Sequence, residues 1–102
     1  GAVTGIALIP YYERVFAGTS QGFVSAYDFQ GKELWMEMME GAVTDIIAWK
    51  NSIIVAEKTG KVNIMTLDGK NKAETKLDTE TTNILKGSDN LYFISGKSIL
   101  NI

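Results

Sequence analysis

The chain contains neither cysteine nor histidine. Without cysteine it has no disulfides and no thiolate chemistry, and it is compatible with either side of a membrane. Without histidine it lacks the commonest general base, the usual partner of a catalytic serine or cysteine, and a common zinc ligand. We therefore predict that the chain is not an enzyme and that it binds no metal and no cofactor.

Basic clusters and long apolar runs are also missing. Ten Lys/Arg stand against 12 Asp/Glu in 102 residues, which gives a net charge of −2. No basic block is present, and this disfavours nucleic-acid binding. No apolar run is long enough to cross a bilayer, so no membrane span is predicted. With 45% hydrophobic and 22% charged residues, the chain is expected to be one globular domain or part of a larger one.

The sequence does contain an internal repeat. GAVTGIALI, which begins at Gly1, recurs as GAVTDIIAW from Gly41, 40 positions later, and GFVSAYDFQGK from Gly22 recurs as GKVNIMTLDGK from Gly60, 38 positions later. A third copy follows at the same spacing of 38, with TTNIL and NLYFI in place of VTDII and SIIVA. Because one register fits all three segments, the chain is predicted to consist of repeated structural units.

Each unit is expected to form four short strands, because β-branched and aromatic residues dominate the segments between turn residues. In the first unit these strands are Val3–Ile9, Arg14–Gly18, Phe23–Asp28 and Lys32–Met38.

The turns are expected to depend on glycine and aspartate. Four glycines are predicted to take positive φ in these turns: Gly22, Gly31, Gly60 and Gly69. Asp28 is expected to accept backbone N–H groups of its own turn. Asp68, with the glycine after it, is predicted to form a shorter, two-residue type I′ hairpin turn.

The apolar pattern differs between inner and outer strands. GIALI, DIIAW, SIIVA and LYFI are apolar on both faces, as expected of strands that are covered on both sides. KNKAETKLD, the fourth strand of the second unit, is polar and rich in lysine, and lysine on an exposed edge discourages unwanted pairing. An apolar inner strand with a charged outer edge describes the blade of a β-propeller.

The first unit resembles a known repeat. RVFAGTSQGFVSAYDFQGKELW is similar to the PQQ-like (quinoprotein-type) propeller repeat, which has an apolar strand, Gly-x-x-x-Gly, a second apolar strand, Asp, a Gly-Lys turn and a Trp. The matching residues are Gly18, Gly22, Asp28, Gly31, Lys32 and Trp35. In the second unit Ala56 and Ala73 replace the first glycine and the tryptophan. The resemblance implies that Trp35 docks one blade against the next.

The resemblance does not bring a cofactor with it. Quinoprotein dehydrogenases need a larger closed propeller and a calcium site, and this chain supplies neither. WD-repeat propellers are the nearest alternative family, but no Gly-His or Trp-Asp signature is present.

Some acidic residues could be considered as catalytic carboxylates or calcium ligands: Asp28, Asp45, Asp68, Asp78 and Asp89. Most stand at strand ends beside glycine, asparagine or lysine, and no D-x-D-x-D-G loop occurs. Turn capping is therefore the favoured interpretation.

Two short segments are possible partner contacts. Tyr11 and Tyr12 follow Pro10, and they could form an interface patch or fold over the edge of the blade. Met36 and Met38 belong to WMEMME, and they could bind a partner or pack between blades, which is the favoured interpretation.

The predicted fold is all-β, with about 2.75 four-stranded antiparallel propeller blades in an incomplete ring. Blade 1 spans residues 1–40, blade 2 spans 41–78, and blade 3 spans 79–102 without its outer strand. Propellers usually close with about four to eight blades, so apolar blade faces would stay open. Either two copies associate to form a six-bladed ring, or the chain is part of a parent propeller.

The expected function is a non-catalytic scaffold or protein-interaction module that self-associates. The alternative is a fragment of a larger ligand-binding or quinoprotein-like enzyme propeller. The parent sequence would discriminate between them, because further blades with histidine, calcium ligands or cysteine pairs would favour the enzyme.

Overall fold

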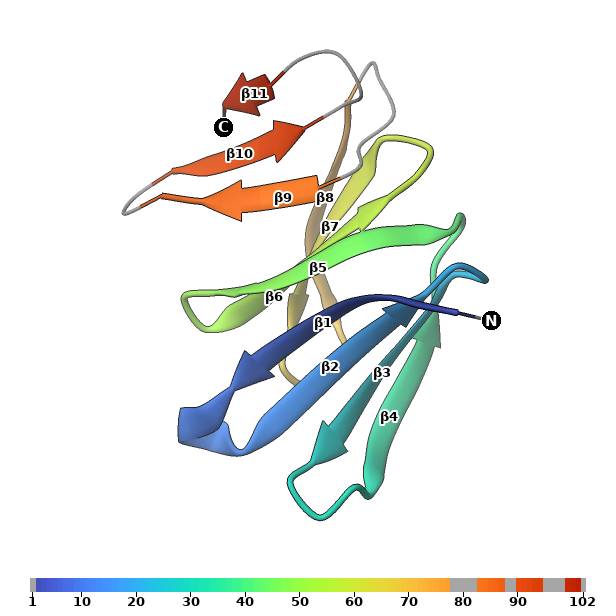
Figure 1. Cartoon of the computed structure of the whole chain (residues 1–102), viewed down its shortest axis with the longest axis vertical. Coiled ribbons are helices and arrows are strands. Elements are labelled where there is room, and N and C mark those ends of the chain that lie inside the picture. Colours follow the sequence, from blue (N-terminus) through green and yellow to red (C-terminus); the bar gives the residue numbers. More distant parts are fainter. Residues whose placement is uncertain (1, 78–82, 88–89, 95–98, 102) are drawn as a thin grey trace.

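The computed structural model describes residues 2–77, 83–87, 90–94 and 99–101. Their strands form three antiparallel sheets, which lie one after another along the molecule (Figure 1). The described residues include one helical element, the 3-10 turn η1 (Pro10–Tyr12). The all-β prediction is confirmed. Asp78 and Asp89 lie outside the described residues.

The first two sheets have four strands each, in chain order. The first sheet contains β1 (Val3–Ile9), β2 (Arg14–Thr19), β3 (Phe23–Asp28) and β4 (Glu33–Met38). The second sheet contains β5 (Val43–Trp49), β6 (Ser52–Glu57), β7 (Lys61–Thr66) and β8 (Asn71–Lys76). The predicted strands of the first unit therefore agree with the structure to within one residue at each end.

The third sheet has the order β11-β10-β9. Its strands are β9 (Asn83–Lys86), β10 (Leu91–Ile94) and β11 (Ile99–Asn101). The inner strands of the three sheets are neighbours, since β1 packs beside β5 and β5 packs beside β9 (Figure 1). Four-stranded antiparallel sheets stacked through their first strands are the arrangement of propeller blades.

Two apolar cores hold the sheets together. The core between the first and second sheets contains these buried residues: Ala7, Phe16, Val24, Ala26, Val43, Ile46, Ile53, Val55 and Met65. The core between the second and third sheets contains Ile54, Ala56, Val62, Ile84 and Leu91. Strands β5, β6 and β7 contribute to both cores because successive side chains of a strand point to opposite faces. The second sheet is therefore covered on both faces, as its apolar pattern predicts.

The β3–β4 turn is capped by its aspartate. The backbone N–H of Gly31 donates to the Asp28 carbonyl at 3.1 Å, and Asp28 Oδ1 accepts from the backbone N–H groups of Gln30 and Lys32, both at 2.9 Å. Gly31 has φ of 86°. This is a three-residue loop in which a left-handed glycine follows a turn.

Asp68 and Gly69 do not form the predicted two-residue type I′ turn. The β7–β8 loop has the length of the β3–β4 loop, since the Thr66 N–H donates to the Lys70 carbonyl at 2.8 Å. Of the two residues only Gly69 has a positive φ (88°), whereas type I′ requires it at both. The Thr66 hydroxyl, which accepts from the Lys70 N–H at 3.1 Å, occupies the capping position that aspartate has in the first sheet. The repeat keeps its loop length while the capping residue changes.

The outer and inner strands differ from each other in exposure. Strand β8 is exposed along its whole length, which agrees with its role as a charged edge. Strand β1 was expected to be covered on both faces, and this prediction is wrong, because Ile6 and Leu8 are exposed. The physical reason is that the described part of the chain packs a second sheet against only one face of the first sheet.

Candidate functional site

The tyrosines and methionines that the sequence offered as partner contacts do not form one patch. Tyr11 and Tyr12 lie in η1, between β1 and β2, with ring centroids 4.8 Å apart in an edge-to-face arrangement. Met36 and Met38 lie on β4, which β2 and β3 separate from β1. All four side chains are exposed.

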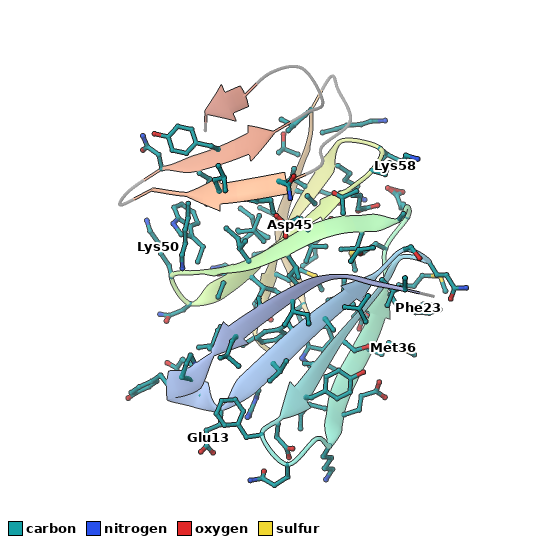
Figure 2. All side chains as sticks on the ribbon, viewed as in Figure 1. Glu13, Phe23, Met36, Asp45, Lys50 and Lys58 are labelled. Carbon is teal, nitrogen blue, oxygen red and sulfur yellow. The ribbon has the colours of Figure 1, made fainter. Side chains whose placement is uncertain are left out.

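One face of the first sheet is apolar and uncovered; we call it the open face. It carries Ile6 (66% exposed), Leu8 (53%), Met36 (52%) and Met38 (67%). The strand registers place these side chains on the same side of the sheet, opposite to Phe16 and the core. Figure 2 shows Met36 pointing away from β4 at the side of the molecule. Exposed apolar surface of this kind marks an interaction site in many proteins.

The repeat shows what such a face does in the second sheet. Ile46 and Ala48 stand 40 positions after Ile6 and Leu8. Ile46 is buried in the core between the first two sheets, and Ala48 packs against that core. The open face is therefore the positional equivalent of the face with which the second sheet docks onto the first.

Trp35 attaches the first sheet to the second. Its indole Nε1–H donates to the Leu67 carbonyl at 2.8 Å, and its ring packs against the core beside Phe16 at a centroid distance of 6.0 Å. The side chain is partly buried rather than largely buried, because β4 is an outer strand. The Trp35 ring lies so close to Gly69 that a Cβ there would stand 2.7 Å from it.

Asp45 joins the second sheet to the third. Its Oδ1 accepts from the Ile46 N–H at 2.9 Å and its Oδ2 from the Ile84 N–H at 2.7 Å. Figure 2 shows Asp45 between β5 and the third sheet. The sequence favoured turn capping for this residue, and its bond to a strand 39 positions away could not be found from local spacing.

The remaining predicted turn residues lie at hairpin ends. Gly22 and Gly60 have φ of 94° and 97°, and their N–H groups donate to the carbonyls of Thr19 and Glu57 at 3.0 and 2.9 Å. Asp68 lies within the β7–β8 loop. These residues shape turns between strands, and they do not meet in a common site.

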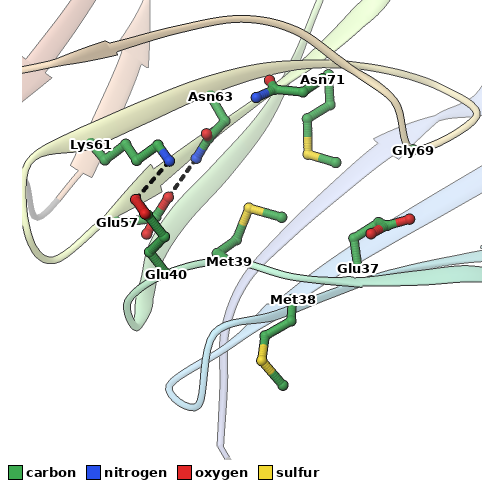
Figure 3. A pocket seen from close by; sticks show the side chains of 10 residues that line it. Glu37, Met38, Met39, Glu40, Glu57, Lys61, Asn63, Gly69 and Asn71 are labelled. Carbon is green, nitrogen blue, oxygen red and sulfur yellow. Dashed lines mark hydrogen bonds and ion pairs between the residues drawn. The ribbon is translucent and has the colours of Figure 1, made fainter.

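A cavity of about 230 Å³ lies between the first two sheets, beside β4 and β7 (Figure 3). Its lining includes Glu37, Met39, Glu57, Lys61, Asn63 and Met65.

Glu57 is the central polar group of this cavity, and it is 0% exposed. Its Oε1 accepts from the backbone N–H of Gly41 at 2.7 Å, and its Oε2 accepts from Asn63 Nδ2 at 2.6 Å. The carboxylate thus ties the segment between the sheets to β7. The sequence analysis missed Glu57. The sequence does contain a signal for a buried polar contact here, because a glutamate ends an apolar strand at the position where the first unit has Thr19.

Lys61 forms two ion pairs at the mouth of the cavity. Its Nζ lies 2.7 Å from Glu40 Oε1 and 2.9 Å from Glu74 Oε2 (Figure 3 shows the first). The hydrogen bond with Glu40, followed by that with Glu74, raises the pKa of the Lys61 ammonium well above its ordinary value. The hydrogen bond from Lys61 lowers the pKa of the Glu74 carboxyl. Both pairs are partly solvated, so their contribution to stability is small.

Two searches of the described residues gave no candidates. Within residues 2–77, 83–87, 90–94 and 99–101, no three His, Cys, Asp or Glu side chains lie close enough together to hold a metal ion. In the same ranges no helix is long and apolar enough to cross a membrane.

Most of the chain matches a known family model. Residues 11–102 match a family described as a family of unknown function (DUF5711). The chain belongs to this family. The comparison with curated proteins found no match.

Solved structures similar to this DUF5711 chain are β-propellers. BamB from Moraxella catarrhalis superimposes with a TM-score of 0.83 at 20% identity, over 94% of this chain and 30% of that chain. Sqt1 from Saccharomyces cerevisiae gives a TM-score of 0.83 at 12% identity, over 96% of this chain and 29% of that chain. BBS1N, solved in complex with ARL6DN, gives 0.82 at 17% identity, over 99% of this chain and 36% of that chain. At these identities the likeness shows the fold alone, and the chain spans about a third of each propeller.

Proposed function

We propose that this chain is a non-catalytic propeller module that binds other blades through its open face. Its three units are assigned as blades 1 (1–40), 2 (41–78) and 3 (79–102). The observation that carries the proposal is the repeat equivalence described above. Ile6 and Leu8 are exposed, while Ile46 at the equivalent position of blade 2 is buried against blade 1.

The third sheet, at the other end of the stack, supports the same proposal. Leu85 on β9 is exposed, and it stands 38 positions after Ile47, which packs in the core between blades 2 and 3. Each end of the stack thus exposes a side chain whose equivalent is packed between blades. Removal of apolar area from water contributes about 25 cal/mol per Å² toward association, against the entropic cost of bringing two chains together.

The occupant that we propose is a second copy of the chain, arranged head to tail. The open face of one copy would meet the Leu85 side of the other, and two such contacts would close a six-bladed ring. That number lies within the usual range of about four to eight blades. Because the same contact would be made twice, the assembly would stop at a dimer.

A second candidate has its own support. The chain covers only 29–36% of the propellers it resembles, so the open face could receive further blades of a longer chain. As part of this second candidate, we propose that the blades are related to PQQ-like repeats. The contact of Trp35 with the following blade through Leu67 supports that relation. In either case the face binds blades and performs no chemistry.

Sedimentation velocity at micromolar concentrations tests the dimer. We expect the wild-type chain to be a dimer, and both Ile6→Glu and Leu85→Glu to be monomers, because each places a charge in a proposed contact. Phe29→Glu is the matched control, since it changes an exposed apolar residue in the β3–β4 turn. A wild-type monomer at all concentrations, or variants that dimerise like the wild type, would contradict the dimer.

A further inference from the structure

We propose that the cavity between blades 1 and 2 binds a small organic amine through its primary ammonium group. The cavity measures about 230 Å³ and lies between the blades, and its lining shares Met38 with the open face. The inference does not rest on the proposed association, because it is argued from Glu57 and Asn63.

The charges around the cavity favour a cation. Four charged side chains line it: Glu37, Glu40, Glu57 and Lys61. Lys61 is already paired, with Glu40 and with Glu74 just outside the lining. In the part of the chain that the structure describes, no cationic side chain pairs with Glu37 or Glu57. A carboxylate taken out of water without a cation is costly, so the fully buried Glu57 supplies most of the attraction.

Asn63 provides a second, independent observation. It is 3% exposed, and Figure 3 shows its side chain pointing into the cavity. Its Nδ2 donates to Glu57, which fixes the orientation of the amide. Among the described residues no donor reaches its Oδ1, so this buried acceptor inside the cavity has no partner in that part of the chain. Buried polar groups without partners are rare, and each calls for a ligand or a water molecule.

A primary ammonium fits this arrangement better than a metal ion. It carries three donors and no acceptor, so it can donate to Asn63 Oδ1. The Glu57 carboxylate, which Gly41 and Asn63 cover, attracts the ammonium by its charge without direct contact. No three acidic side chains within the described residues lie close enough together for a metal. Met39 and Met65 line the same cavity, and methionine side chains adapt to an alkyl chain. The ligand class is therefore a short alkylamine.

The experiment is a titration of the ¹⁵N-labelled chain with 1,4-diaminobutane, followed by NMR. The reporters are the Gly41 backbone amide and the Asn63 side-chain amide, because both donate to Glu57. We expect saturable shifts of both signals, and no such shifts with 1-butanol, which has a similar chain and no charge. Glu57→Gln preserves the size and an acceptor for Gly41 and removes the charge, so it should weaken binding at least tenfold.

Two further variants keep the test decisive. Glu13→Gln removes an exposed carboxylate in the β1–β2 connection, and we expect it to bind the amine like the wild type. Met39→Lys supplies an ammonium from the chain itself, so its Gly41 and Asn63 signals should resemble the amine-bound state and respond no further. Shifts that do not saturate, equal binding by Glu57→Gln, or Met39→Lys that still binds the amine would overturn the proposal. The sedimentation of Glu57→Gln should equal that of the wild type, which separates this test from that of the dimer.

Discussion

At the scale of single residues, one aromatic side chain and one glycine meet at the junction between blades 1 and 2. Trp35 donates to the Leu67 carbonyl and packs over Gly69, where an added Cβ would stand 2.7 Å from Trp35 Cδ2. At Gly31, the equivalent glycine of blade 1, the same Cβ would meet nothing within 4 Å among the described residues. Both glycines have nearly the same positive φ, 88° and 86°. The two positions therefore separate backbone strain from packing.

We predict that Gly31→Ala destabilises the chain by about 1–2 kcal/mol, the cost of a left-handed L-residue. Gly69→Ala should cost at least about 1 kcal/mol more, because the new methyl group forces the tryptophan ring to move. Trp35→Ala alone should cost about 3 kcal/mol, the lower end for large aromatic truncations, since the ring is partly exposed. Urea denaturation measures all three variants.

The control for this prediction is the same pair of alanine variants in a Trp35→Ala background. There the extra cost at Gly69 should disappear, because the clashing ring is gone, and the two glycine positions should become equal. An extra cost at Gly69 that persists without the tryptophan would show that the ring is not its cause.

At the scale of the elements, the attachment of the third sheet uses hydrogen bonds as well as apolar packing. Asp45 in β5 accepts from the N–H of Ile84 in β9 at 2.7 Å. The equivalent residue of the first sheet is Gly5, whose backbone lies so close to Ile46 that a Cβ would meet its Cγ2 at 2.9 Å. One junction thus requires the absence of a side chain, while the other uses a carboxylate to bridge between sheets. The first junction also has a bond of its own, from the Thr4 hydroxyl to the Val43 carbonyl.

We predict that Asp45→Ala destabilises the chain by about 1–3 kcal/mol, because it leaves the buried Ile84 N–H without an acceptor. Hydrogen exchange of the Ile84 amide should become faster, which reports on the β5–β9 junction directly. Thr44→Ala is the control, since the Thr44 hydroxyl bonds to the Ala56 carbonyl within the second sheet and its loss should leave the Ile84 amide protected. Unchanged exchange of the Ile84 amide in Asp45→Ala would rule out the bridge.

At the scale of the whole molecule, the first sheet is covered on one face only within the described residues. The same kind of strand is buried in the second sheet and exposed in the first, where Ile6 and Leu8 lie on the open face. Stability of such a stack depends on nearest-neighbour contacts between units, as in other repeat proteins. A partner that binds the open face should therefore raise the free energy of unfolding of the chain.

We predict that the midpoint of thermal unfolding rises by several degrees when the wild-type concentration is raised a hundredfold, because folding is then coupled to association. Ile6→Glu should unfold at a temperature that does not depend on concentration. Differential scanning calorimetry at several concentrations measures both proteins. A wild-type midpoint that stays constant would show that association does not contribute to the stability of the blades.

The amino-acid sequence by itself determined the strands, the glycine turns and the propeller class of fold. These features depend on local chemistry: the β-branched and aromatic residues of the strand segments, and the freedom of glycine at positive φ in the turns between them. Only the tertiary structure decided which polar groups meet. Glu57 reaches Gly41 across 16 positions, and Asp45 reaches Ile84 across 39. Such contacts cannot be predicted from local spacing, because they form only when one sheet stacks on the next. The exposure of Ile6 was decided in the same way, since an apolar strand pattern is identical whether or not a neighbouring sheet covers it.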